Sequence, residues 1–176
     1  MDTAQLMKET HGGAAAQPRR VLFVCTGNTC RSPMAAALLN DLSRPREICS
    51  AQGELTGARY VAASAGLYAQ EGEPITPAAA AALQDEGIAC RPDNDYLSHR
   101  ARLVSADMVA EADVIVGLTA SHAMQLLLRF PEAASKIGTL PMDIADPFGG
   151  SPAVYRDCLS QLRYAIELAF FTEDTK

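Results

Sequence analysis

The chain has 176 residues, of which 48% are hydrophobic and 20% are charged, and its formal net charge at pH 7 is −6. This length normally gives one domain that buries about 70% of its unfolded surface, and the acidic balance excludes a general nucleic-acid binder while it allows a local positive site. No stretch resembles a secretion signal or a membrane span, so we expect a cytoplasmic protein that binds neither nucleic acid nor membrane.

A flexible N-terminal tail is predicted for residues 1–18, which mix Gly, Ala, Gln and charged residues without periodicity. Residues 19–176 are predicted to form the single domain. Within that domain, residues 44–58 contain Pro45, Gly53 and Gly57 and follow neither the helical nor the strand period. This segment is therefore predicted to be a loop.

A strand, a tight loop and a helix follow the tail. The apolar run at residues 21–24 predicts a buried strand. Ser32 is a candidate N-cap and Pro33 suits the first helical position, which predicts a helix from Ser32 to about Ser43. In the loop between strand and helix, Gly27 and Asn28 are residue types that tolerate positive φ. Backbone N–H groups of such a loop, helped by the positive end of the helix dipole, bind anions.

The loop begins at Cys25 and ends at Arg31, and this pair predicts phosphoryl chemistry. The inward N–H donors and Arg31 stabilise a thiolate, and the arginine fork matches two oxygens of a phosphate. A thiolate that faces a bound phosphoryl group is a nucleophile. A bare Cys-x5-Arg pattern also fits an inert cysteine and a salt-bridged arginine, but the flanking strand and helix start favour the anion loop.

The chain has five cysteines, and an odd number without a secretion signal does not predict a disulfide framework. Only Cys25 and Cys30 are close in sequence, so no metal site and no cofactor are expected. Cys30 could trap an oxidised Cys25 as a reversible disulfide and so serve as a redox partner. The alternative, in which Cys30 only packs, is equally open at this point.

The rest of the chain alternates short strands with helices, which predicts a parallel sheet covered on both faces with right-handed crossovers. Strands are expected at residues 60–64, 113–117 and 137–140, and helices at 77–86, 103–110, from 121 onward, and 152–171. Residues 88–102 are expected to be a polar connection. In the helix that begins at Ser121, we expect Met124, Leu127 and Leu128 to face inward and His122 to be exposed.

Asp146, which is followed by Pro147, is a candidate general acid. Pro147 limits the backbone of Asp146 to extended conformations, which suits a carboxylate that projects from a loop. If that loop lies over Cys25, Asp146 can protonate the leaving group and later activate water against a cysteinyl phosphate. An Asp-Pro pair alone is usually a turn, and Asp143 is a nearby competitor that we expect to face solvent.

Both motifs resemble those of the low-molecular-weight protein tyrosine phosphatases. The first resembles the phosphate-binding loop of that family and reads Cys25-Thr26-Gly27-Asn28-Thr29-Cys30-Arg31-Ser32-Pro33. The second, Asp146-Pro147-Phe148-Gly149-Gly150, stands where the family places its general acid. The resemblance implies a single-domain, doubly wound α/β fold whose four parallel strands have the order 2-1-3-4. It also implies that residues 19–176 form a low-molecular-weight phosphatase domain. The loop at about 44–58 is longer than this family needs, so it is predicted to be a loop insertion.

The resemblance further implies roles for residues of the site. Cys25, Arg31 and Asp146 would be catalytic, and the phosphate-binding loop would also include Thr26, Gly27, Asn28, Thr29, Cys30 and Ser32. Ser32 would hydrogen-bond the thiolate, Asn28 would brace the loop, and His99 would pack beside it in a structural role. A non-enzymatic phosphate-binding module is a weaker interpretation, because all three catalytic residues are present.

Two positions bear on the substrate. Family members that act on phosphotyrosine generally have a bulky aliphatic residue at the position of Thr29 and tyrosines after the Asp-Pro pair. Thr29 and Phe148 instead resemble the bacterial protein-arginine phosphatases, and Phe148 could stack on either planar group. We therefore expect hydrolysis of phosphoarginine in proteins, with phosphotyrosine as the alternative. The partners expected are phosphorylated proteins and phosphate or other oxyanions in the loop, and the chain is expected to be a monomer or weak dimer.

A thioredoxin-coupled arsenate reductase shares this fold and a similar loop, and it is a remote alternative. It would need two further cysteines close together on a mobile segment. Cys90 is placed about where one of them would be, but no partner follows it closely. Cys49 and Cys158 are expected elsewhere in the fold.

Overall fold

The computed structural model describes residues 17–44 and 60–171. Nearly all of the predicted tail at 1–18 and of the predicted insertion at 44–58 lies outside these ranges. The sheet has four parallel strands, β1 (Arg19–Cys25), β2 (Tyr60–Gly66), β3 (Val114–Gly117) and β4 (Ile137–Thr139). Their order is β2-β1-β3-β4, which confirms the predicted order 2-1-3-4.

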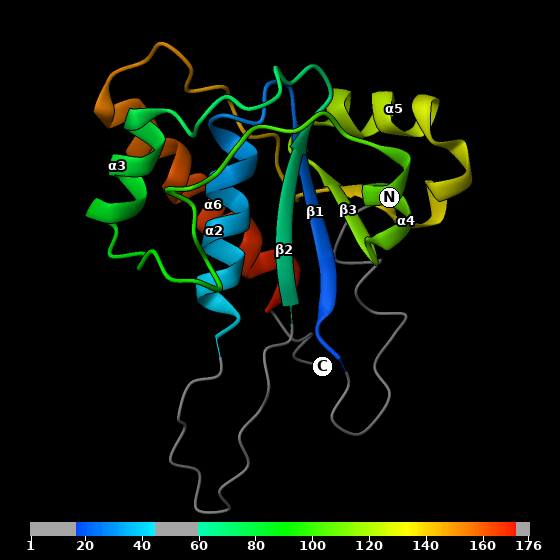
Figure 1. The fold of residues 1–176 in the computed structure, drawn as a ribbon, viewed down its shortest axis with the longest axis horizontal. Coiled ribbons are helices and arrows are strands. Elements are labelled where there is room, and N and C mark those ends of the chain that lie inside the picture. The colour runs from blue at the N-terminus through cyan, green and yellow to red at the C-terminus, as the bar shows by residue number, and fades with distance from the viewer. Residues whose placement is uncertain (1–16, 45–59, 172–176) are drawn as a thin grey trace, which may run out of the picture.

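Helices cover both faces of this sheet (Figure 1). One face carries α2 (Arg31–Leu42), α3 (Pro77–Asp85) and α6 (Pro152–Phe170). The other carries α4 (Ala106–Glu111), α5 (Ala120–Arg129) and the short 3-10 helix η1 (Pro131–Lys136). This is the doubly wound α/β arrangement that was expected. In the described part of the chain, no helix is both long enough and apolar enough to cross a membrane.

Strand β1 is buried on both sides because its alternating side chains enter different cores. Val21, Phe23 and Cys25 belong to the core under α2, α3 and α6. Leu22 and Val24 belong to the core under α4 and α5. The continuous apolar run of this strand is therefore what a central parallel strand requires, and the run ends at the cysteine that begins the loop.

The start of α2 differs from the prediction. The helix begins at Arg31 with Cys30 at the N-cap position, and no side chain caps it. Ser32 does not serve as the cap because its hydroxyl contacts the Cys25 sulfur and accepts a hydrogen bond from Asn28. In contrast, α3 has the predicted cap, since the side chain of Thr76 accepts a hydrogen bond from the backbone of Ala79.

Two further helices begin at serine or threonine caps that shift their bounds. Ser105 caps α4, so this helix starts at Ala106, while Leu103 forms an isolated parallel bridge with Gly66. Thr119 caps α5, which starts at Ala120. Serine and threonine are strong N-cap residues, and in both helices the cap marks the start better than the apolar pattern does.

The prediction for the inner face of α5 is wrong in part. The buried residues of this helix are His122, Ala123 and Leu126, whereas Met124 is 57% exposed and Leu128 is 77% exposed. Leu127 is partly buried against the core. Successive helical residues lie about 100° apart, so of three consecutive leucines only one can occupy the centre of the buried stripe.

Candidate active site

The loops that follow β1, β2 and β4 meet at the carboxyl edge of the sheet, which is the upper edge in Figure 1. They enclose a cavity of about 280 Å³. Its lining consists of residues 25–31 of the loop after β1 together with Tyr68, Gln70, Glu73, Asp146 and Phe148. The carboxyl edge of a parallel sheet is where ligands of doubly wound folds bind, so this cavity is the candidate active site.

Cys25 lies at the base of the loop with its side chain buried. Its sulfur is 3.0 Å from the Ser32 hydroxyl and accepts a hydrogen bond from the backbone N–H of Asn28 at 3.3 Å. Asn28 has φ of +58°, the left-handed region; Gly27, the other expected position, does not have a positive φ. This one left-handed residue turns the loop back so that a backbone donor points at the sulfur.

Asn28 is held by four contacts at once. Its amide nitrogen donates to the hydroxyls of Ser32 and Ser64, both at 2.9 Å, and its amide oxygen accepts from the backbone N–H of Arg102 at 2.9 Å. Its backbone oxygen lies 2.7 Å from a ring nitrogen of His99. Since Asn28 is fully buried, every polar group it brings inside has a partner.

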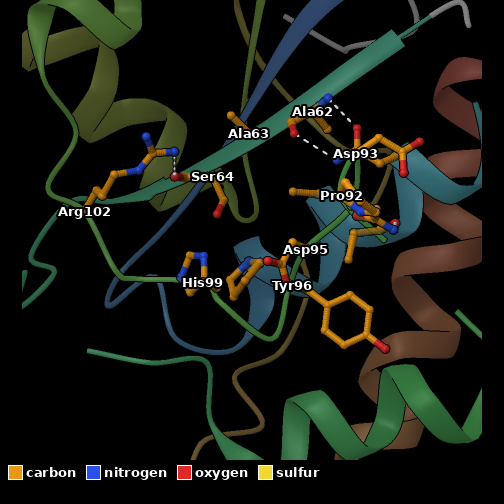
Figure 2. A pocket seen from close by; sticks show the side chains of 14 residues that line it. Ala62, Ala63, Ser64, Pro92, Asp93, Asp95, Tyr96, His99 and Arg102 are labelled. Atoms are coloured by element: carbon orange, nitrogen blue, oxygen red, sulfur yellow. Dashed lines mark hydrogen bonds between the residues drawn. The ribbon is translucent and has the colours of Figure 1, made fainter. Parts of the chain in front are cut away.

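The three residues that contact Asn28 from outside the loop, Ser64, His99 and Arg102, also line a second cavity of about 240 Å³ (Figure 2). All three face it, and the Arg102 guanidinium donates to the backbone oxygen of Ser64 at 3.4 Å. Burial lowers the pKa of His99, and the nearby charge of Arg102 lowers it further. His99 does not line the cavity at Cys25, and its contact is with the loop backbone, as expected for a structural residue.

A close approach of β2 also shapes the loop. Gly66, the last residue of β2, would place a Cβ atom 2.6 Å from the backbone oxygen of Thr26 and 3.0 Å from the backbone nitrogen of Asn28. No side chain fits in that space. Glycine at this position therefore allows the loop and the end of β2 to pack backbone against backbone.

Arg31 and Asp146 meet at the cavity although they are far apart in the sequence. Arg31 is only 6% exposed, and its two terminal nitrogens donate to the backbone oxygen of Ile144 at 3.2 Å and to the Asp146 carboxylate at 2.6 Å. The Asp146 side chain is 50% exposed, and its second oxygen accepts from the backbone of Phe148 at 3.2 Å. The structure thus brings Cys25, Arg31 and Asp146 to one cavity.

Other predicted residues lie where the sequence placed them. Phe148 is 73% exposed and lines the cavity rim, and Thr29 lines the cavity as well. Asp143 is exposed and accepts from the backbone of Ala120 at 2.8 Å. It does not line the cavity.

Cys30 is buried, and its sulfur has contacts beyond the loop. It lies 3.4 Å from the hydroxyl of Thr76 and 3.4 Å from that of Tyr155. Burial, followed by the hydrogen bond with Cys30, raises the pKa of Tyr155 to about 12, so this phenol stays neutral and can donate. These contacts give Cys30 a packing role, and its redox partnership with Cys25 stays a prediction.

The sequence prediction did not single out Tyr68, Gln70 or Glu73, which line the cavity, and it was wrong about His122. It was expected to be exposed, but it is 5% exposed. Its two ring nitrogens lie 3.0 Å from the hydroxyl of Thr26 and 2.9 Å from that of Thr119. Burial, together with the charge of Arg31, lowers its pKa to about 4. The signal that could have found it is its position three residues after Thr119, the helix cap that follows β3 after one intervening residue.

The remaining cysteines bear on the reductase alternative. Cys158 was expected elsewhere in the fold, but it lies beside the segment that carries Asp146. Its buried thiol donates to the backbone of Ala145, next to the candidate acid, at 3.8 Å. Burial raises the pKa of Cys158 to about 12, so it is a thiol and a weak nucleophile at neutral pH. Cys90 is exposed, donates to Asp95 and does not line the cavity, and Cys49 lies outside the described residues.

Across residues 17–44 and 60–171, no group of three or more His, Cys, Asp or Glu side chains is arranged to hold a metal ion. The cavity lining includes the Cys25 thiol, the Arg31 guanidinium and the Asp146 carboxylate. Such a set can bind an oxyanion, attack it and transfer a proton without a further group.

Comparison with known proteins agrees with this chemistry. The sequence model described as low molecular weight phosphotyrosine protein phosphatase matches residues 20–173. The chain is 37% identical to a protein-arginine-phosphatase of Geobacillus stearothermophilus over 85% of this chain and 93% of that protein. It is 32% identical to a low molecular weight protein-tyrosine-phosphatase of Streptomyces coelicolor over 83% of this chain and 88% of that protein.

Solved structures show the same likeness. The YwlE arginine phosphatase from Geobacillus stearothermophilus superposes with a TM-score of 0.71, covering 86% of this chain and 91% of that one at 37% identity. A cysteine-to-serine mutant of YwlE with a phosphorylated active site serine superposes with a TM-score of 0.70, covering 85% of this chain and 93% of that one at 30% identity.

Proposed function

The chain belongs to the low molecular weight phosphotyrosine protein phosphatase family, and from that premise we propose that it hydrolyses phosphoarginine in proteins through a phosphocysteine intermediate. The observation that carries the proposal is the meeting of Cys25, Arg31 and Asp146 at one cavity on the carboxyl edge of the sheet. The domain responsible is proposed to be residues 19–176.

In the first step, the loop binds the phosphoryl group and its charge is stabilised. Phosphoryl transfer proceeds through a loose transition state, so catalysis depends on positioning and on donors aimed at the equatorial oxygens. The backbone N–H groups of the loop and the Arg31 fork supply these donors. The Cys25 sulfur forms a bond to phosphorus while the bond to the leaving group breaks, and Asp146 gives its proton to the departing nitrogen or oxygen.

The contact between Arg31 and Asp146 suits this step. One terminal nitrogen of Arg31 donates to Asp146. The same nitrogen would donate to an oxygen of a bound phosphate, because a guanidinium binds phosphate with two parallel N–H groups. A bound phosphoryl group therefore competes with the carboxylate for Arg31. The displaced carboxyl group is then available at the rim, beside the leaving group.

In the second step, water hydrolyses the phosphocysteine. The Asp146 carboxylate removes a proton from water, the water oxygen attacks phosphorus, and the bond between sulfur and phosphorus breaks. The Ser32 hydroxyl lies 3.0 Å from the sulfur and donates to the backbone oxygen of Ala65 at 3.2 Å. As the thiolate departs, the hydroxyl turns its proton to the sulfur. Asn28 orients that hydroxyl through its hydrogen bond to the hydroxyl oxygen.

Thr29 and Phe148 support phosphoarginine as the substrate. Both line the cavity. A hydroxyl at position 29 accepts hydrogen bonds from a polar guanidinium or orients water, whereas an aliphatic side chain would favour an aryl ring. Phe148 offers a planar face on which a guanidinium stacks. The arginine phosphatase of Geobacillus stearothermophilus, to which the chain is 37% identical, supports the same assignment.

The test compares initial rates on matched phosphoarginine and phosphotyrosine peptides under reducing conditions. We expect a preference for phosphoarginine of at least tenfold in kcat/KM, which is about 1.4 kcal/mol of differential transition-state binding. Thr29→Ile should reduce this preference. Cys25→Ser should abolish turnover of both peptides and of a generic aryl phosphate. A preference for phosphotyrosine would overturn the arginine assignment.

Hydrolysis of phosphotyrosine is the second candidate function. It is favoured by the two exposed aromatic residues at the rim, Tyr68 and Phe148, since an aryl ring also packs between aromatic walls. The likeness to the Streptomyces coelicolor tyrosine phosphatase agrees with it. Arsenate-dependent oxidation of thiols would instead support the reductase alternative, which the raised pKa of Cys158 makes weaker.

A further inference from the structure

The cavity has two sides that come from different parts of the chain. Strand β2 lies on one side of β1, and β3 with β4 lies on the other. The segments that follow β2 and β4 both contribute residues to the cavity lining. Asp146 and Phe148 come from the segment after β4, and Gln70 and Glu73 come from the segment after β2. The cavity rim thus carries a second carboxyl group, to which the mechanism above assigns no role.

The backbone at Glu73 is held firmly beside the loop. Its oxygen accepts from the backbone N–H of Ala101 at 2.7 Å, and the N–H of Gly72 donates to the oxygen of Ala101 at 2.9 Å. Gly72 has φ of +87°, a conformation that favours glycine. Three residues after Glu73, the N–H of Thr76 donates to the backbone oxygen of Thr29 at 2.9 Å. The rim position of Glu73 is therefore fixed relative to the phosphate-binding loop.

The carboxylate of Glu73 is exposed, and within residues 17–44 and 60–171 it has no hydrogen-bond or ion-pair partner. A negative charge at the rim does not help to bind a phosphate dianion, because like charges repel. Its favourable partner must be a part of the substrate beyond the phosphate. That part would carry positive charge and N–H donors.

The two substrate classes differ in this respect. In phosphoarginine, the phosphate is attached to a guanidinium whose remaining N–H groups point away from phosphorus. Guanidinium N–H groups form strong, charge-assisted hydrogen bonds with carboxylates. In phosphotyrosine, the phosphate is attached to an aryl ring that offers neither charge nor N–H donors. A rim carboxylate therefore favours the first class and gives nothing to the second.

We propose that Glu73 is a specificity-determining residue whose carboxylate accepts hydrogen bonds from the substrate guanidinium, on the part of the cavity rim that the segment after β2 forms. This inference rests on the proposed phosphoarginine phosphatase function. The guanidinium would lie between the carboxyl groups of Asp146 and Glu73, with Phe148 beside its plane. Glu73 takes no part in bond making or breaking, so its effect lies in substrate binding.

The chain offers a matched control two residues away. Glu71 is exposed on the same segment but does not line the cavity. The experiment measures kcat and KM of the full chain for matched phosphoarginine and phosphotyrosine peptides, using the wild type, Glu73→Gln and Glu71→Gln. Glu73→Asp serves as the conservative variant. Surface substitutions of this kind change stability little, and thermal unfolding of each variant checks this.

We expect Glu73→Gln to raise KM for the phosphoarginine peptide about tenfold, with kcat nearly unchanged. The phosphotyrosine peptide should be turned over equally well or better, because a repulsive charge is gone. Glu71→Gln should match the wild type on both peptides, and Glu73→Asp should recover part of the loss. The effect of Glu73→Gln should shrink at high salt, since the contact is exposed.

Two results would overturn this inference while the proposed function stands. One is a wild type that prefers phosphoarginine and a Glu73→Gln variant that matches Glu71→Gln. The other is an equal loss on both peptides, which would indicate a structural effect on the loop. A wild type that prefers phosphotyrosine, or that hydrolyses neither peptide, would overturn the arginine assignment and this inference with it.

Discussion

Asp146 is the residue at which proton transfer can be isolated from the rest of the mechanism. Its carboxyl group lies at the rim, half exposed, with one oxygen on Arg31 and the other on the backbone of Phe148. Asp146→Asn keeps the size of the side chain and one of its two acceptor oxygens but removes the acid. We expect kcat to fall by about 10²–10⁴, the usual range for general acid–base catalysis.

The size of this fall should depend on the leaving group. An aryl phosphate with a weakly basic leaving group needs little protonation, so its first step should slow least. Single-turnover rates for two aryl phosphates of different leaving-group basicity measure the difference. If both rates fall equally, Asp146 acts through the position of Arg31 and does not supply the proton.

His122 predicts a pH dependence of stability. Its pKa is about 4 in the folded chain, and burial and Arg31 cause the shift, with Asp146 and Asp143 opposing it. An unfolded histidine has a pKa of about 6.5, so between pH 6.5 and 4 the unfolded state binds a proton that the folded state does not. Stability therefore falls as the pH drops through this window, by up to about 3 kcal/mol.

Unfolding in urea at pH 7.5 and 4.5 measures this effect in the wild type and in His122→Gln. The variant cannot ionise at this position, so its free energy of unfolding should change less between the two pH values. His99, whose pKa is also lowered, remains in both proteins. Parallel changes in the two proteins would mean that His122 does not control the acid sensitivity.

Single residues of the site differ in how well the sequence predicted them. Cys25, Arg31 and Asp146 were placed correctly because short motifs carry them and because loops after parallel strands meet at one edge. The burial of His122 was missed, because the apolar pattern of the helix does not show a contact with Thr26, which follows a different strand. The position of Glu73 at the rim depends on how the segment after β2 folds back onto Ala101.

At the scale of elements, the junction between β2 and the phosphate-binding loop is sterically tight. Gly66→Ala would place a methyl group against the backbone of Thr26 and Asn28, and backbone atoms cannot move aside cheaply. We expect a destabilisation of about 1–3 kcal/mol, the cost of overpacking. Phosphate affinity should also fall, because the loop must open. Denaturant unfolding and competitive inhibition by phosphate measure the two effects.

Gly27→Ala provides the contrast for the stability measurement. A Cβ at Gly27 would meet only the Thr29 hydroxyl, at 3.8 Å. The free energy of unfolding should therefore change much less in Gly27→Ala than in Gly66→Ala. Equal destabilisation by both substitutions would mean that loss of glycine flexibility, rather than the contact at β2, sets the cost.

Strands were predicted better than helix faces. A central parallel strand is buried on both faces, so residues 21–24 could be predicted as a strand without deciding which side chains face the core. In α5, several apolar residues could occupy the one buried stripe. The face that is buried is the one that carries His122, which contacts Thr26. The start of α2 was predicted at the wrong residue because Ser32 was taken as the N-cap. Its hydroxyl instead contacts the Cys25 sulfur, and N-cap preferences do not account for such a contact.

At the scale of the whole molecule, oxyanion binding should be visible as thermal stabilisation. A ligand at 100 times its Kd that binds only the folded chain stabilises it by about 2.7 kcal/mol. For a protein of this size, that corresponds to a rise in Tm of roughly 5–10 °C. Phosphate should produce this rise, and sodium chloride at equal ionic strength should not.

Arg31→Lys tests the origin of the rise. Lysine keeps the charge but loses the fork of donors, so most of the phosphate-dependent rise in Tm should disappear. A full rise in the variant would show that phosphate stabilises the protein at another place or through net charge alone.

The central position of β1 has a consequence for synthesis on the ribosome. β1 emerges early, yet its second edge is covered only by β3, where Val21 pairs with Val114. At about 5–20 residues per second, that partner follows roughly 5 to 20 s later. During this interval a strand whose residues 21–25 are all apolar has an open edge, which is a template for aggregation. Nascent chains arrested before β3 should therefore bind chaperones that recognise extended apolar segments, and chains arrested after β4 should be released from them.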